Sequence, residues 1–137
     1  MITFQWLLIS NMRKFKIAIL GGGNIGTSLA KGLINSKQFT YNDILITEKR
    51  EPRIAHLKEL GFLVTDNNHE AVKQAEIVVM SVKPQQFGNL AEEIKKVCPK
   101  SVIMATGSIT VPEEAEEFIA SGKCDMVALG RTIIADA

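Results

Sequence analysis

Lys16-Ile-Ala-Ile-Leu-Gly-Gly-Gly-Asn-Ile-Gly-Thr-Ser28 is the stretch that decides the fold of this chain. Its apolar residues Ile17–Leu20 predict a buried strand, which runs directly into the pattern Gly21-x-Gly23-x-x-Gly26. Leu29 and Leu33 follow four residues apart, as on one face of a helix. A strand, a glycine-rich turn and a helix in this order form the dinucleotide-binding fingerprint.

Each glycine of this turn has a separate mechanical role in such a site. Gly21 permits the tight turn, Gly23 lets the backbone approach a pyrophosphate, and Gly26 lets the helix pack closely on the strand. The helix that begins here directs free N–H groups and the positive end of its dipole toward the phosphates. The sequence therefore predicts a nucleotide site, and the alternative is a glycine-rich turn without a ligand.

The composition is that of a single globular domain. Of the 137 residues, 46% are hydrophobic and 23% are charged, which is enough to bury one core. A net charge of +1 gives no electrostatic reason to expect nucleic acid or an acidic membrane surface as a partner. Cys98 and Cys124 lack metal-ligand spacing, so we predict no metal site, two reduced thiols and a cytoplasmic location.

We expect the domain to comprise residues 14–137, after a loosely ordered N-terminal extension of residues 1–13. The apolar run Trp6–Ile9 in this extension is far shorter than the ~20 residues that a membrane-spanning helix needs. No basic segment precedes the run, as a secretory signal would require.

Strand and helix patterns alternate along the chain, which predicts a parallel sheet covered by helices on both faces. Right-handed crossovers then give a doubly wound, Rossmann-like α/β fold of about six strands in the order 3-2-1-4-5-6. The predicted strands are Ile17–Leu20, Asp43–Thr47, Phe62–Val64, Ile77–Met80, Val102–Ala105 and Met126–Leu129. The predicted helices follow Gly26, Pro52, Asn67, Pro84 and Thr110.

Ligands of such sheets bind beyond the carboxyl ends of the strands. After the second predicted strand, Glu48 lies 22 residues beyond Gly26, the range of a carboxylate that bonds ribose hydroxyls and favours NAD. Lys49 and Arg50 follow at once and are suited to a 2′-phosphate, which favours NADP. Both cofactors stay open at this point, as does a charged loop without a ligand role.

Two further turns lie at the same predicted edge of the sheet. Lys83, ahead of the helix-starting Pro84, either stands near the nicotinamide half of the cofactor or points into solvent. Ala105-Thr106-Gly107 is a turn of small residues, where a backbone can approach a ligand. The pattern contains no convincing nucleophile–base pair, so no catalytic residue is predicted.

Four motifs together resemble the N-terminal domain of pyrroline-5-carboxylate reductase, namely Ile19–Gly26, Ala30–Leu33, Ala75–Val78 and Val82–Gln85. The resemblance covers about residues 14–107. It implies a domain that binds NADP or NAD and delivers hydride to a cyclic imine in proline synthesis. The cofactor-binding residues that it implies are Gly21, Gly22, Gly23, Asn24, Ile25, Gly26, Glu48, Lys49, Arg50, Val82, Lys83, Pro84, Ala105, Thr106 and Gly107.

Beyond residue 107 the resemblance changes. The reductase family would continue into an all-helical domain that forms the dimer and much of the substrate pocket. Residues 102–137 are instead similar to the last βαβ unit of flavin-dependent barrels of the old yellow enzyme and dienoyl-CoA reductase family. In that family, the turn matching Gly107-Ser108 and the pair Gly130-Arg131 hold the flavin phosphate. The chain therefore has the pattern of a chimera, natural or engineered, joined near residues 102–107.

We expect an NAD(P)-binding domain with weak or absent turnover of its own, because these residues contain no counterpart of the helical substrate domain. An exposed final strand also favours a homodimer. Two alternatives stay open: a folding scaffold without a physiological ligand, and a binder of FMN or phosphate through Gly130 and Arg131.

Overall fold

The computed structural model describes residues 15–98, 102–106, 112–122 and 124–128. The predicted N-terminal extension, Gly107, the helix cap at Thr110 and the Gly130-Arg131 pair lie outside these residues. Within the described ranges, no helix is long and apolar enough to cross a membrane.

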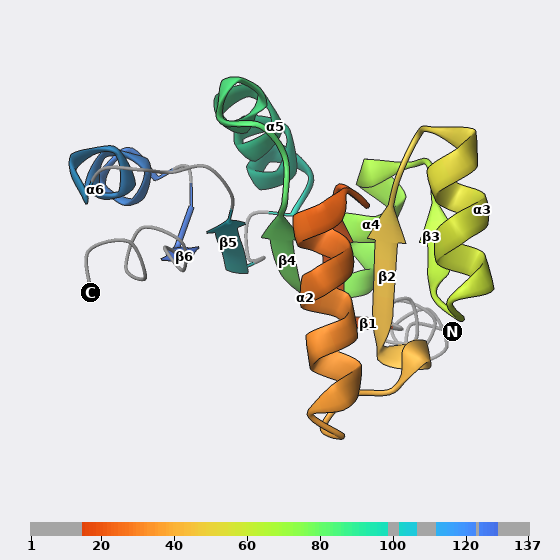
Figure 1. The fold of residues 1–137 in the computed structure, drawn as a ribbon. Coiled ribbons are helices and arrows are strands. Elements are labelled where there is room, and N and C mark those ends of the chain that lie inside the picture. Colours follow the sequence, from red (N-terminus) through yellow and green to blue (C-terminus); the bar gives the residue numbers. More distant parts are fainter. Residues whose placement is uncertain (1–14, 99–101, 107–111, 123, 129–137) are drawn as a thin grey trace, which may run out of the picture.

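A six-stranded parallel sheet forms the centre of the molecule, in the order β3-β2-β1-β4-β5-β6 (Figure 1). This confirms the predicted strand order and the Rossmann-like α/β class. β1 lies in the middle, and its Ile19 pairs with Ile46 on one side and with Val79 on the other. The strands are β1 (Phe15–Leu20), β2 (Ile44–Thr47), β3 (Leu63–Thr65), β4 (Ala75–Met80), β5 (Val102–Thr106) and β6 (Met126–Ala128).

The helices begin where the local sequence supplies a start. Pro52 lies in the first turn of α3, and Asn67 caps α4 by accepting a hydrogen bond from the backbone N–H of Glu70 at 3.0 Å. The helices are α2 (Asn24–Asn35), α3 (Glu51–Glu59), α4 (Asn68–Gln74), α5 (Pro84–Val97) and α6 (Pro112–Ala120), with a 3₁₀ turn η1 (Tyr41–Asp43) before β2.

The third strand begins one residue later than predicted. Phe62 is not part of β3, because its N–H donates to the carbonyl oxygen of Leu57 at 3.1 Å and so closes the end of α3. Its buried side chain packs against Tyr41, with ring centroids 5.1 Å apart.

The core consists of two layers, one on each face of the sheet. Because neighbouring strand residues point to opposite faces, Ile17 and Ile19 pack toward α2 and α3, whereas Ala18 and Leu20 pack toward α4, α5 and α6. β1 is therefore buried on both sides, as its apolar run predicts.

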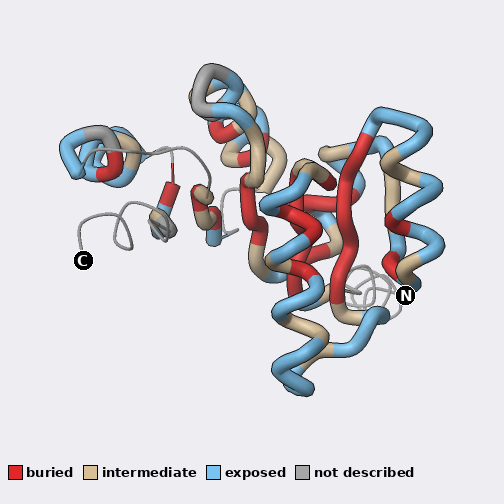
Figure 2. The backbone as a smooth tube through the Cα atoms, viewed as in Figure 1, coloured by how far each residue is buried: buried red, intermediate tan, exposed pale blue. Residues whose placement is uncertain are grey.

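The prediction that helices cover both faces is wrong for β6 and holds only in part for β5. All four residues of β2 are buried (Figure 2). In contrast, Val102 in β5 and Met126 in β6 are 38% and 41% exposed. On the α2 side, Met104 of β5 packs against the cluster that contains Ala30 of α2, and no described residue of β6 belongs to that cluster. The reason is the handedness of the crossovers: the chain reverses its direction across the sheet after β3, so right-handed connections put the later helices on the opposite face.

Candidate functional site

The turn after β1 joins the carboxyl ends of neighbouring strands. Gly21 has a φ of +108°, and its N–H donates to the carbonyl oxygen of Thr47 at the end of β2 at 3.1 Å. On the other side, the N–H of Ser81 after β4 donates to the carbonyl oxygen of Leu20 at 2.8 Å. A side chain at Gly21 would collide with the carbonyl oxygen of Ser81, so the fold itself requires this glycine.

The other glycines of the turn differ in what surrounds them. A Cβ at Gly26 would collide with the carbonyl oxygen of Gly21, and one at Gly22 would lie 2.6 Å from Cδ1 of Leu57. A Cβ at Gly23, in contrast, would have no atom within 4 Å. Packing therefore explains Gly22 and Gly26, whereas the space in front of Gly23 is open to a ligand.

α2 begins at this turn without a side-chain cap. Gly23 is the N-cap residue, and the first turn of α2 contains no acidic residue. The first N–H to bond within the helix is that of Thr27, which donates to the carbonyl oxygen of Gly23 at 2.9 Å. The preceding N–H groups of Asn24, Ile25 and Gly26 have no partner inside the helix, and together with the helix dipole they favour an anion.

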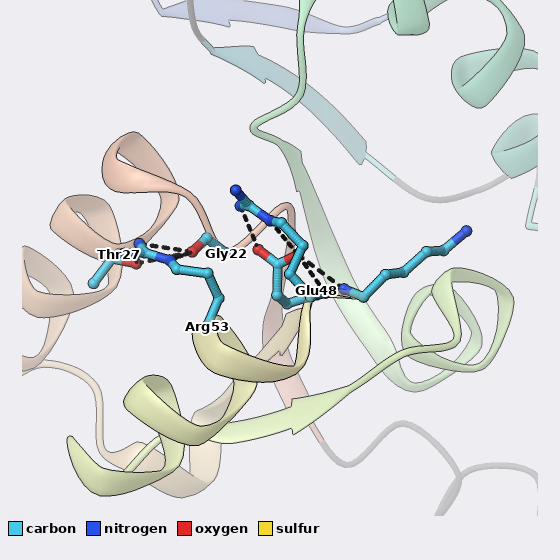
Figure 3. Close-up of polar contacts among 6 residues, drawn as sticks. Gly22, Thr27, Glu48 and Arg53 are labelled. Carbon is cyan, nitrogen blue, oxygen red and sulfur yellow. Dashed lines mark hydrogen bonds and ion pairs between the residues drawn. The ribbon is translucent and has the colours of Figure 1, made fainter.

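Arg53, which the sequence analysis did not single out, reaches from α3 to the glycine turn (Figure 3). Its Nε and Nη2 donate to the carbonyl oxygen of Gly22 at 3.1 and 2.9 Å, and Nη2 also donates to Oγ1 of Thr27 at 3.1 Å. In a trans peptide the C=O and the following N–H point in opposite directions, so this anchor turns the N–H of Gly23 away from α3. The partners are 31 residues apart, which is why no local motif indicated them.

Glu48 lies at the end of β2, on the other side of Gly22 from Arg53 (Figure 3). Its Oε1 accepts hydrogen bonds from the backbone N–H groups of Lys49 (2.9 Å) and Arg50 (3.1 Å) and from Nε of Arg50 (3.1 Å). Its Oε2 accepts one from Nη2 of Arg50 at 2.8 Å. These bonds, the side-chain bond from Arg50 first, lower the pKa of Glu48 to about 2 although burial opposes the shift.

The remaining predicted residues lie after β4 and β5. Lys83 is exposed and occupies the N-cap position of α5 without a side-chain cap, while the half-buried Val82 packs against the core. The side chain of Ala105 is fully buried in the core, and Thr106 is half-buried at the end of β5. The structure thus brings the glycine turn, the loop after β2 and the turn after β4 together, with the end of β5 beside β4.

Two hollows lie near the edge strand β3. One of about 380 Å³ opens beside the loop after β2 and was not predicted; it is lined by Lys49, Asp66, Asn67, Asn68, His69 and Glu93. The other, of about 560 Å³, lies between β3 and α4, and its lining includes Phe15, Leu45 and Phe62 but no predicted site residue.

The doubly wound sheet and the glycine turn at its carboxyl edge define a Rossmann-like α/β domain. The family described as NADP oxidoreductase, coenzyme F420-dependent, matches residues 16–108, and the chain belongs to this family.

The chain is also similar to curated pyrroline-5-carboxylate reductases, which confirms the resemblance predicted for its N-terminal part. It is 44% identical over 80 residues to pyrroline-5-carboxylate reductase 1 of Dictyostelium discoideum, a match covering 58% of this chain and 14% of that protein. It is 40% identical over 89 residues to reductase 2 of the same organism, covering 64% and 30%. The chain therefore spans less than a third of the length of these relatives.

Two solved structures of pyrroline carboxylate reductases share the fold of this chain. The pyrroline-5-carboxylate reductase from Coxiella burnetii has a TM-score of 0.68 and 22% identity, over 85% of this chain and 44% of that one. Pyrroline carboxylate reductase from Plasmodium falciparum, solved with NADP bound, has a TM-score of 0.56 and 20% identity, over 77% and 38%.

Proposed function

We propose that this chain binds a nicotinamide dinucleotide, NADP(H) or NAD(H), as the cofactor domain of an oxidoreductase similar to pyrroline-5-carboxylate reductase. The observation that carries the proposal is the glycine turn, where open space in front of Gly23 adjoins the uncapped start of α2. The residues present fit a pyrophosphate, because N–H donors and free volume lie together and no carboxylate competes in the first helical turn.

In this proposal the pyrophosphate rests on residues 21–26, and Arg53 is a positioning residue that fixes the Gly22–Gly23 peptide. The loop Glu48–Arg50 contacts the adenosine ribose. Residues 82–84 and 105–107 line the nicotinamide half, and Ala105 contributes only its backbone because its side chain is buried.

The bound cofactor would supply hydride for reduction of a cyclic imine, pyrroline-5-carboxylate, to proline. We propose that much of the contact with this substrate comes from the part of the relatives that these residues do not match, so that the chain alone turns over weakly or not at all. The homodimer, the cytoplasmic location, the junction near residues 102–107 and the flavin-barrel resemblance stay predictions.

The test is a fluorescence titration of the purified chain with NADPH, NADH and, as a control ligand, FMN. We expect saturable binding of at least one nicotinamide nucleotide, weakened roughly tenfold or more in Gly23→Ala because the added methyl group fills the open space. Gly32→Ala is the matched control: it adds the same group in α2 where a Cβ also meets nothing within 4 Å, and binding should not change.

Three outcomes contradict the proposal. A folded chain that binds neither nicotinamide nucleotide supports the scaffold alternative, and saturable binding of FMN alone supports the flavin alternative. Equal affinities in Gly23→Ala and Gly32→Ala would place any nucleotide elsewhere on the molecule.

A further inference from the structure

The hollow between β3 and α4 is lined by large apolar residues. Its volume is about 560 Å³, and its lining includes Phe15, Leu45, Phe62 and Leu63. Leu63 pairs with Leu45, so both side chains lie on the α4 face of the sheet, and Leu63 is 42% exposed. Apolar groups that fill this hollow would gain free energy, because they remove such surface from water.

The strand beside this hollow also has a free edge. β3 is the outermost strand of the sheet and pairs only with β2 among the described residues. The N–H and C=O groups of one strand residue point to the same side, and those of the next residue point to the other. The carbonyl oxygen of Thr65 accepts from the N–H of Glu48 on the β2 side at 3.0 Å, so the backbone groups of Val64 point to the open edge. An extended segment placed along β3 can bond to them.

The chain itself supplies a segment with a matching pattern. Phe15 is the first described residue and lines the hollow, so the residues that precede it join β1 beside this site. In this segment every second residue is apolar, as in a strand with one buried face: Ile2, Phe4, Trp6 and Leu8. Aromatic and β-branched residues such as these also favour the extended conformation.

The connection between this segment and β1 is long enough for the segment to reach β3. Leu8 precedes Phe15 by seven residues, and an extended chain of that length spans up to roughly 25 Å. β3 lies two strands from β1, a separation of about 10 Å. Ser10 and Asn11, which lie within the connection, are residues that favour a turn.

We propose that residues 2–9 of this chain fold back along the free edge of β3 and cover the hollow, with Phe4, Trp6 and Leu8 facing Leu45 and Leu63. The occupant is the chain's own segment, because its covalent connection to Phe15 gives it a high effective concentration at this site. The sequence by itself predicts loose order for this segment, whereas the hollow gives it a docking surface. This inference does not depend on the proposed function.

Trp6 is the single tryptophan of the chain, so its fluorescence reports on this segment alone. In the full chain its emission should lie at shorter wavelength than that of N-acetyl-tryptophanamide and be quenched less by acrylamide, because the indole is removed from water. Leu63→Lys should shift the emission toward that of the reference compound and increase the quenching, because it places a charge in the hollow. Met126→Lys is the matched control: Met126 is 41% exposed on the opposite edge strand, β6, and the emission should not change.

A second pair of variants tests the alternation and leaves the described residues unchanged. Leu8→Lys changes the row that faces the hollow and should expose Trp6 to acrylamide. Leu7→Lys makes the same change on the opposite face of the segment and should leave the quenching nearly unchanged. Because neither variant alters a described residue, this pair also tests the inference if Leu63→Lys fails to fold.

Emission and quenching equal to those of N-acetyl-tryptophanamide in the folded wild type overturn this inference. Equal responses to Leu8→Lys and Leu7→Lys, or to Leu63→Lys and Met126→Lys, do the same. A protected Trp6 that becomes exposed on dilution, as a dimer dissociates in size-exclusion chromatography, would assign the hollow to the segment of a second copy and also overturn it. The nucleotide titrations are independent of all these outcomes.

Discussion

In the half of the sheet made of β1, β2 and β3, the hydrogen bonds of Arg53 and Glu48 lie at the carboxyl ends of the strands. In the half made of β4, β5 and β6, Asp125 lies at the amino ends: its Oδ2 accepts from the N–H of Ile103 at 2.8 Å and from Nζ of Lys95 at 3.2 Å. The first group of hydrogen bonds shapes the carboxyl edge, where ligands of this fold bind. The second group holds β5 in place at the amino edge. Equally polar clusters in one sheet thus have different expected consequences for binding.

One strand from each half, β2 and β5, also differ in burial. β2 is buried on both faces (Figure 2). β5 instead alternates, with Ile103 and Ala105 buried and Val102 exposed. β1 and β2, next to the glycine turn, are therefore packed on both faces, whereas β5 is buried mainly on the face toward α5 and α6.

The largest expected effect tests this difference in burial. Ile46→Ala in β2 should lower the free energy of unfolding by about 3 kcal/mol, because it leaves a cavity between two packed layers. Val102→Ala in β5 should cost less than about 1 kcal/mol, because that side chain faces solvent. Urea denaturation of both variants measures this, and equal losses would contradict the proposed asymmetry.

The next prediction separates the two polar clusters. Asp125→Ala should lower the free energy of unfolding by about 1 to 2 kcal/mol, because the buried Ile103 loses its acceptor, and should leave the dissociation constant of NADPH unchanged. Arg53→Met should lower the free energy of unfolding by about 1 kcal/mol and weaken the binding of NADPH roughly tenfold, because the Gly22–Gly23 peptide loses its hydrogen bonds to Arg53. Arg53→Lys, which can still donate to the carbonyl of Gly22, should recover part of the affinity.

Urea denaturation and titration with NADPH, both on the same samples of Asp125→Ala and Arg53→Met, check these two expectations. If Asp125→Ala weakens NADPH binding as much as Arg53→Met does, the carboxyl edge of the sheet is not more important for binding than the amino edge.

The smallest expected effect is a pH dependence in the first half. The pKa of Glu48 falls from 4.5 to about 2 on folding, so its stabilising contribution is complete above about pH 4.5 and is lost as the pH drops to about 2. Because Arg50 is largely exposed, we expect only about 1 kcal/mol from this pair. Over this range the wild type should lose that much more stability than Glu48→Gln, as measured by denaturation at each pH.

Glu59→Gln, a change of an exposed carboxylate on α3, is the control and should follow the wild-type pH profile. A wild type whose stability falls at low pH just as that of Glu48→Gln does would show that the ion pair between Glu48 and Arg50 does not stabilise the fold.

Local patterns in the sequence determined most of the architecture. Apolar runs placed the strands, Pro52 and Asn67 placed helix starts, and the glycine spacing after β1 located the turn. These features depend on a few neighbouring residues, and right-handed crossovers then leave one common strand order. The sequence also predicted that Glu48, Lys49 and Arg50 follow a strand at the carboxyl edge of the sheet, because parallel strands end at the same edge.

Only the tertiary structure decided what those residues do to one another. Arg53 meets Gly22 across 31 residues, and Glu48 is buried beside Gly22, so neither contact follows from a local motif. The sequence alone supported a free carboxylate and a free arginine equally, and packing made them a pair. The open face of β5 and β6 likewise depends on where distant helices lie, because burial is a property of the assembled layers and not of any single segment.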